Sequence, residues 1–106
     1  MNWAEGQIGP KRLTTKQISK DGKTAFNAYI YYPGDLMPPP AWNYTDWTAE
    51  VSVCNWPGGW ENRPEWFYKK HPGGELLEVV HWAEVTLRDM VEFWENKEWQ
   101  HIKSNT

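Results

Sequence analysis

Side chains that could bind a metal ion or attack a substrate are few in this chain and lie far apart in its sequence. His71 and His81 are ten residues apart, His101 lies twenty residues beyond His81, and Cys54 is the single cysteine. Structural metal sites draw ligands from residues a few positions apart, and a reactive thiol needs a neighbouring base or cation. His81 and Glu84 would share a helical face, but exposed helices carry many such pairs. The spacing therefore predicts no metal ion, no cofactor, no catalytic residue and no enzymatic activity.

Aromatic side chains are far more abundant, and they gather in residues 54–67, CNWPGGWENRPEWF. The chain has nine Trp, five Tyr and three Phe, which is 16% of its residues. Trp56 and Trp66 can fold back on the adjacent prolines and close one end of a core. The segment can instead be a protein interface, where Trp, Tyr and Arg supply hot spots. As a third alternative, its rings can stack on sugars while polar neighbours bind the hydroxyl groups, namely Asn55, Glu61, Asn62 and Arg63.

A repeated turn pattern singles out Trp60 within this segment. A ring followed by Pro-Gly occurs three times, at 32–34, 56–59 and 71–74. Pro and Gly suit the two central positions of a type II turn, so we expect three turns at strand ends. Trp60 lies outside that pattern. Together with Glu61 and Arg63, it is the predicted partner-binding part of the segment.

A second candidate surface is acidic. Asp89, Glu92, Glu95 and Glu98 recur at every third position. They can form an ordinary solvated helix face, or a surface that engages a basic groove on another protein. Trp99 and Ile102 would then supply an apolar anchor beside the carboxylates.

The charge of the chain is uneven along its length. Residues 1–43 carry five basic and three acidic side chains, and residues 44–106 carry six and eleven, for a net charge of −3. This balance argues against direct nucleic-acid binding through bulk charge. A local alternative is single-strand binding by the basic hairpin that contains Lys16, Lys20 and Lys23, together with its tyrosines.

Composition also bears on the compartment. The first ten residues, MNWAEGQIGP, lack the apolar run of a signal peptide. The longest apolar run, at 28–32, is far too short to span a membrane. A single cysteine fits a reducing environment. We therefore expect a cytoplasmic protein that does not enter a membrane.

The first half of the chain is expected to form antiparallel strands. Asp21-Gly22 between alternating runs predicts a two-residue type I′ hairpin turn, which places residues whose numbers sum to 43 opposite each other. Residues 43–54 alternate as a half-exposed strand, with Trp47 and Val51 on the core face. Residues 65–70 form a shorter candidate strand, and the prolines in 32–42 indicate an extended connector.

The last third is expected to be mainly helical. Apolar residues recur at steps of four and three, as in one helix that begins near Glu75; they are Leu76, Val80, Ala83, Leu87, Met90 and Trp94. The alternative is a buried strand followed by a short helix capped by Thr86, because Val79, Val80 and Val85 are β-branched. In both cases residues 1–106 form a single small α+β domain. Its expected architecture is an antiparallel, meander-like sheet of about four to five strands with a C-terminal helix packed on one face.

A short, acidic, Trp-rich chain with one cysteine and no catalytic motif is similar in general character to small accessory proteins of phages and mobile elements. Anti-CRISPR and other anti-defence inhibitors are among them, and bacterial immunity proteins share the same properties. The similarity implies a non-enzymatic inhibitor that occludes a larger protein or protein–nucleic-acid complex with a basic surface. The predicted partner-binding residues are Trp60, Glu61, Arg63, Asp89, Glu92, Glu95 and Trp99. A carbohydrate-binding module, a toxin-neutralising immunity protein and a single-strand binder remain as alternatives.

Overall fold

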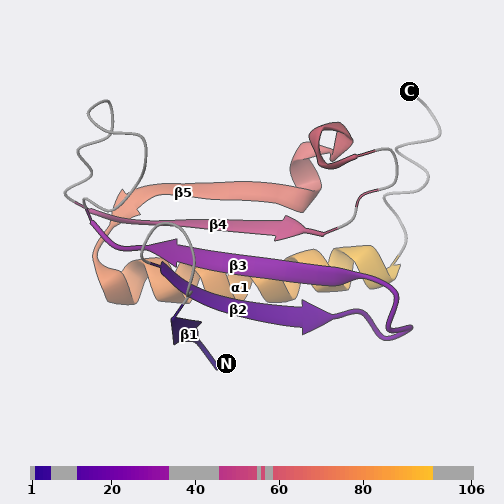
Figure 1. Cartoon of the computed structure of the whole chain (residues 1–106), viewed down its shortest axis with the longest axis horizontal. Helices are drawn as coiled ribbons and strands as arrows, with labels where there is room; N and C mark the ends of the chain where they lie inside the picture. Colours follow the sequence, from indigo (N-terminus) through magenta and orange to yellow (C-terminus); the bar gives the residue numbers. More distant parts are fainter. Residues whose placement is uncertain (1, 6–11, 34–45, 55, 57–58, 97–106) are drawn as a thin grey trace.

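The computed structural model describes residues 2–5, 12–33, 46–54, 56 and 59–96, without the side chain of Trp60. It confirms an α+β fold with one antiparallel sheet and one helix (Figure 1). The sheet has strand order β1-β2-β3-β4-β5. The strands are β1 (Ala4–Glu5), β2 (Arg12–Ile18), β3 (Ala25–Tyr31), β4 (Trp47–Val53) and β5 (Tyr68–Gly74). Two 3₁₀ turns, Trp60–Asn62 and Glu65–Phe67, precede β5, and helix α1 (Leu76–Asn96) follows it. The proline-rich connector predicted at 32–42 lies largely outside the described residues.

The β2–β3 hairpin has the predicted register and a different turn. Leu13 pairs with Ile30, Thr15 with Ala28 and Gln17 with Phe26. Hydrogen bonds from Ser19 N–H to the Thr24 carbonyl and from Gly22 N–H to the Ser19 carbonyl close a loop of four residues. The Asp21 carboxylate accepts from the Ser19 hydroxyl (2.6 Å) and from Lys23 N–H (2.9 Å). These side-chain bonds stabilise the wider loop, so the predicted two-residue turn is wrong.

Strand β4 alternates as predicted, but its outer face is more enclosed than expected. Ala49, Val51 and Val53 lie in the core. On the other face, Thr48 and Ser52 are each only 8% exposed. They pair with Tyr31 and Tyr68 on the neighbouring strands, so a large side chain lies directly across from each.

The turn predicted at 71–74 is wrong, because these residues belong to strand β5. Trp47 pairs with Gly74 and Ala49 with His71, so two steps on β4 match three on β5. This is the signature of a β-bulge, in which one strand holds an extra residue. Gly73 has φ +149 within it. Pro72 is tolerated because β5 is an edge strand and its missing N–H removes no ladder bond from the sheet interior.

Helix α1 is continuous and packs against β3, β4 and β5. The alternative of a strand followed by a short helix is therefore wrong. In Figure 1 the sheet lies in front of α1, which runs behind it as a second layer. The helix buries one stripe against the core side of the sheet: Val79, Ala83, Leu87, Met90 and Val91. Leu77, which breaks the predicted stripe, is 83% exposed.

Candidate binding surfaces

The tryptophan-rich segment forms an aromatic corner of the core. Trp56 is 5% exposed. Its ring centroid lies 5.5 Å from that of Phe67 and 6.1 Å from that of Trp94. Phe26 meets Trp94 edge-on at 5.8 Å. The packing leaves the Trp56 ring no free face for a ligand. Trp56 therefore cannot stack on a sugar, as one alternative for this segment proposed.

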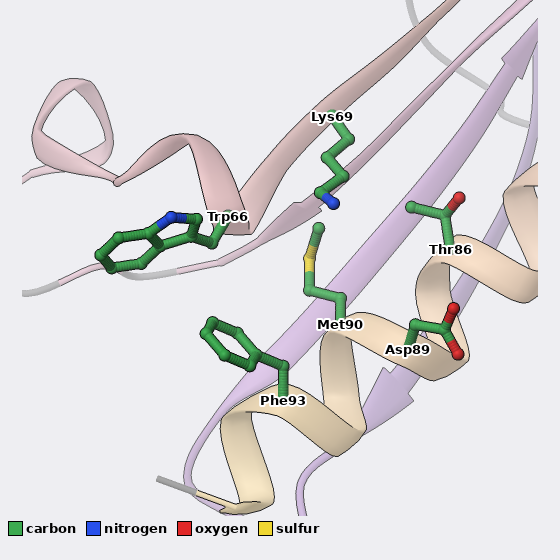
Figure 2. A pocket seen from close by; sticks show the side chains of 6 residues that line it. All are labelled: Trp66, Lys69, Thr86, Asp89, Met90 and Phe93. Carbon is green, nitrogen blue, oxygen red and sulfur yellow. The ribbon is translucent and has the colours of Figure 1, made fainter. Parts of the chain in front are cut away.

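Trp66 is half-buried and packs edge-on against Phe67 and Phe93. Its remaining surface faces a pocket of about 300 Å³ between α1 and the start of β5 (Figure 2). The pocket is lined by Trp66, Lys69, Thr86, Asp89, Met90 and Phe93. In Figure 2, Phe93 projects from α1 toward Trp66, and Met90 projects toward the end of the Lys69 side chain, which enters from β5. Of these residues, Asp89 alone is among the predicted site residues.

The carboxylates of α1 fall into two groups. The helix contains five acidic residues and one arginine, Arg88. Three of the acids contact other parts of the chain. Glu84 accepts from Trp3 Nε1–H at 3.0 Å, Glu95 accepts from the Lys20 backbone N–H at 2.9 Å, and Glu78 lies 3.9 Å from His71 Nε2. Glu95, predicted to bind a partner, therefore also holds the β2–β3 loop against the helix.

Asp89 and Glu92 form the second group. Both are exposed, and neither makes a hydrogen bond or ion pair with the described part of the chain. Glu92 lies near the helix C-terminus, whose negative dipole disfavours a carboxylate by about 0.3–1 kcal/mol. The last turn contains no basic residue. The helix dipole therefore does not favour an acid at position 92.

Of the remaining predicted residues, Glu61 and Arg63 lie within the described part of the chain. Glu61 is exposed in the first 3₁₀ turn. Arg63 donates to the Val53 carbonyl at 3.2 Å, and its guanidinium carbon lies 4.7 Å from the centroid of the Tyr68 ring. This contact places Arg63 at the face of the sheet opposite α1. Trp99 and the side chain of Trp60 lie outside the described residues.

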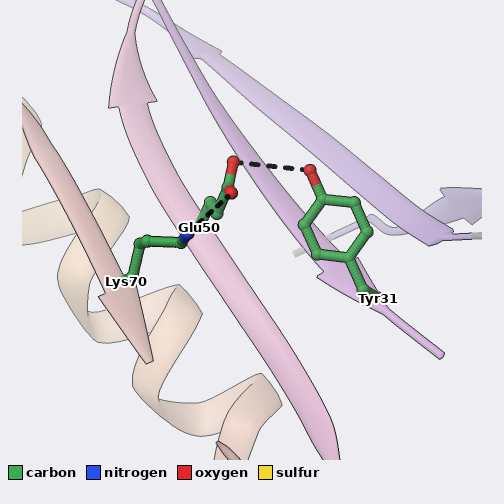
Figure 3. A network of polar contacts seen from close by, with 3 residues as sticks. All are labelled: Tyr31, Glu50 and Lys70. Atoms are coloured by element: carbon green, nitrogen blue, oxygen red, sulfur yellow. Dashed lines mark hydrogen bonds and ion pairs between the residues drawn. The ribbon is translucent and has the colours of Figure 1, made fainter. Parts of the chain in front are cut away.

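The face of the sheet opposite α1, here called the open face, carries a polar network that the sequence reasoning missed. Glu50 accepts from the Tyr31 hydroxyl at 3.4 Å and lies 3.7 Å from Lys70 Nζ (Figure 3). Burial, reinforced by the Glu50 carboxylate, raises the pKa of Tyr31 to about 12. The same two causes raise the pKa of Tyr68. The sequence carries a signal for this face, because the alternation of β2 and β3 puts Arg12, Thr14 and Lys16 on the same side as Tyr29 and Tyr31.

The structure offers little for catalysis or metal binding among the residues it describes. Burial raises the pKa of the Cys54 thiol, which keeps it protonated near neutral pH. Within the described ranges, no group of three or more His, Cys, Asp or Glu side chains is placed to hold a metal ion. None of the helices in those ranges has the length and apolar character needed to cross a membrane.

No protein-family model, no curated protein sequence and no solved structure matches this chain.

Proposed function

We propose that this chain is a small protein-binding inhibitor without catalytic activity. It acts in the cytoplasm by covering a basic surface of a larger protein or protein–nucleic-acid complex. The observation that carries the proposal is the exposed carboxylate of Asp89, which lines the pocket between Trp66 and Phe93 and has no partner in the described part of the chain. A second exposed carboxylate without such a partner, Glu92, lies three residues later on α1.

An apolar pocket beside charges is the usual composition of a binding hot spot. An inserted side chain supplies most of the affinity, while surrounding charges steer the encounter and select the partner. Trp66, Met90 and Phe93 supply the apolar part of the pocket lining, and Lys69, Thr86 and Asp89 supply its polar part. A complementary partner presents an aromatic or aliphatic side chain flanked by Lys or Arg.

The general character of the chain supports a narrower assignment to the anti-CRISPR or other anti-defence inhibitors of phages and mobile elements. Targets of such inhibitors handle nucleic acids and therefore carry basic surfaces. A toxin-neutralising immunity protein could use the same acidic surface, so the identity of the captured partner separates the two assignments.

The test is affinity capture from a host lysate with the wild-type chain and two charge-reversal variants. D89K/E92K reverses the proposed surface. E75K/E78K makes the same charge change at the other end of α1, where Glu75 and Glu78 are also exposed. We expect a stoichiometric partner with wild type and with E75K/E78K, and its loss with D89K/E92K.

A pocket-filling variant, T86Y, tests the apolar anchor separately. Thr86 lines the pocket and is half-buried, so a tyrosine there would occupy the space without removing core atoms. We expect it to abolish capture while the far-ultraviolet circular dichroism stays unchanged. Absence of a stoichiometric partner, or equal capture by all variants, would contradict the proposal.

A further inference from the structure

The fold separates charges that are mixed along the sequence. Among the described residues, four cationic side chains gather on or over the open face: Arg12, Lys16, Arg63 and Lys70. Strand register places the first two and Lys70 on this face, and the contact with Tyr68 places Arg63 there. One carboxylate, Glu50, lies among them. The acids of α1 lie in the other layer of the molecule.

Three tyrosines lie among these cations. Tyr29 and Tyr31 on β3 have ring centroids 6.3 Å apart, and Tyr68 lies on β5. Each of the two arginines covers one ring. The Arg12 guanidinium carbon is 4.6 Å from the Tyr29 centroid, and that of Arg63 is 4.7 Å from the Tyr68 centroid. All three tyrosines are half-buried, so part of each ring meets solvent.

This combination has a specific chemical complement. Tyrosine rings and guanidinium planes are surfaces on which unpaired bases stack. Guanidinium and ammonium groups beside them bind phosphate oxygens. A duplex keeps its bases stacked on one another inside the helix, so they are not free to stack on these tyrosine rings. An acidic peptide would use the cations but leave the planar surfaces without a matching partner.

We propose that the open face binds single-stranded nucleic acid, with phosphates at its four cations and bases against its tyrosines. The acidic net charge of the chain argued against this class of ligand. However, charges separated by more than about 10 Å are largely screened at 0.1 M salt, so the local cations dominate at this face. The proposal does not depend on the helix surface, because the two lie in different layers and can be occupied together.

The test measures fluorescence anisotropy of a labelled oligothymidylate of about twelve nucleotides, a length in the usual range for one small domain. Lys70 and Lys69 give a matched pair of variants. They are neighbours on β5 and both exposed, but Lys70 pairs with Glu50 on the open face, while Lys69 lies at the pocket beside α1. Both alanine variants remove one positive charge. We expect K70A to weaken binding about threefold to tenfold and K69A to leave it unchanged.

A third variant moves affinity in the opposite direction. E50Q removes the carboxylate that lies between Tyr31 and Lys70 and keeps a side chain of similar size, so we expect it to bind more tightly than wild type. For wild type, the logarithm of affinity should fall with the logarithm of salt concentration with a slope of up to about −3, the value for four phosphate contacts to a single strand. K70A should make that slope shallower by about 0.7.

Four results would overturn the proposal. They are no binding at about 50 mM salt, equal loss in K69A and K70A, tighter binding of a duplex of the same length, and equal competition by polyglutamate. The last two would assign the face to a duplex or to acidic proteins. Circular dichroism of each variant confirms that the fold is retained, so a loss of binding reports on the face itself.

Discussion

Phe67 is the side chain whose removal should cost the most stability. It is fully buried and its ring lies within 5.4 Å of the Trp94 ring, 5.5 Å of Trp56 and 5.7 Å of Phe93, measured between centroids. A buried Phe→Ala change destabilises proteins by about 3–5 kcal/mol. Rigid rings on several sides cannot collapse easily into the space left behind. We therefore expect Phe67→Ala to lower the free energy of unfolding by about 4–5 kcal/mol.

A loss of this size is a large share of the about 5–15 kcal/mol that stabilises a domain. Each kilocalorie lowers the melting temperature by about 4–8 °C in a chain of this length, so a fall of at least about 16 °C is expected. Urea unfolding, followed by tryptophan fluorescence, measures the free energy of unfolding of the wild type and of Phe67→Ala. Because Phe67 is far from the chain termini and central to the corner, the transition should move to lower urea with little change in slope.

Leu77→Ala is the control for this measurement. Leu77 is 83% exposed on α1, so its truncation should change stability by less than about 0.5 kcal/mol. If Phe67→Ala cost less than about 1 kcal/mol, the aromatic corner would not be the packed end of the core, and Trp56 would become available again as a ligand-binding ring.

Three further predictions concern single groups. The pKa of Tyr31 rises from 10.0 to about 12 on folding, so the folded state holds this proton more tightly than the unfolded state; the resulting stabilisation is complete below pH 10 and is lost as pH rises toward 12. The urea midpoint should fall with rising pH across this range for wild type and should fall less for Tyr31→Phe. An equal dependence of the two midpoints on pH would refute the raised pKa of Tyr31. Burial raises the pKa of Cys54, so the native thiol should react with a disulfide reagent far more slowly than the thiol of the urea-unfolded chain, and equal rates would contradict its protection. Gly22 has φ +75 with nothing within 4 Å of an added Cβ, so Gly22→Ala should lower the free energy of unfolding by about 1 kcal/mol through backbone strain alone. Gly22→Asn should lower it less, because Asn tolerates this conformation. A lower urea midpoint for Gly22→Asn than for Gly22→Ala would exclude backbone strain as the cause.

Local sequence signals predicted those parts of the fold whose cause is local. The alternation around Asp21-Gly22 predicted the register of β2 and β3, and the spacing from Leu76 to Trp94 predicted α1. The turn failed because the Asp21 side chain, rather than the backbone alone, closes the loop. The bulge at Pro72–Gly73 was mistaken for a turn because the same two residue types suit both, and only pairing with β4 distinguishes them.

The candidate surfaces were harder to predict because they depend on contacts between distant segments. Asp89 and Glu92 were predicted from their spacing, and the structure leaves both exposed on α1. The pocket lined by Asp89 arises where Trp66 and Lys69 meet a helix twenty residues later in the chain, and no periodicity encodes that contact. The open face required all of β2, β3, β4 and β5 in register before Glu50 could be placed between Tyr31 and Lys70.

The bulged edge strand also bears on how the protein behaves at high concentration. An open sheet edge is a template for pairing with a second chain, and proteins block such edges with prolines, lysines and bulges. Strand β5 has all three, in Pro72, the exposed Lys69 and Lys70, and the irregular step at Gly73. Two β5 edges brought together would lack a hydrogen-bond donor and oppose like charges. This edge therefore resists sheet extension and amyloid-like stacking. The exposed apolar surface at the neighbouring pocket lies beside a strand edge that does not readily pair with another chain.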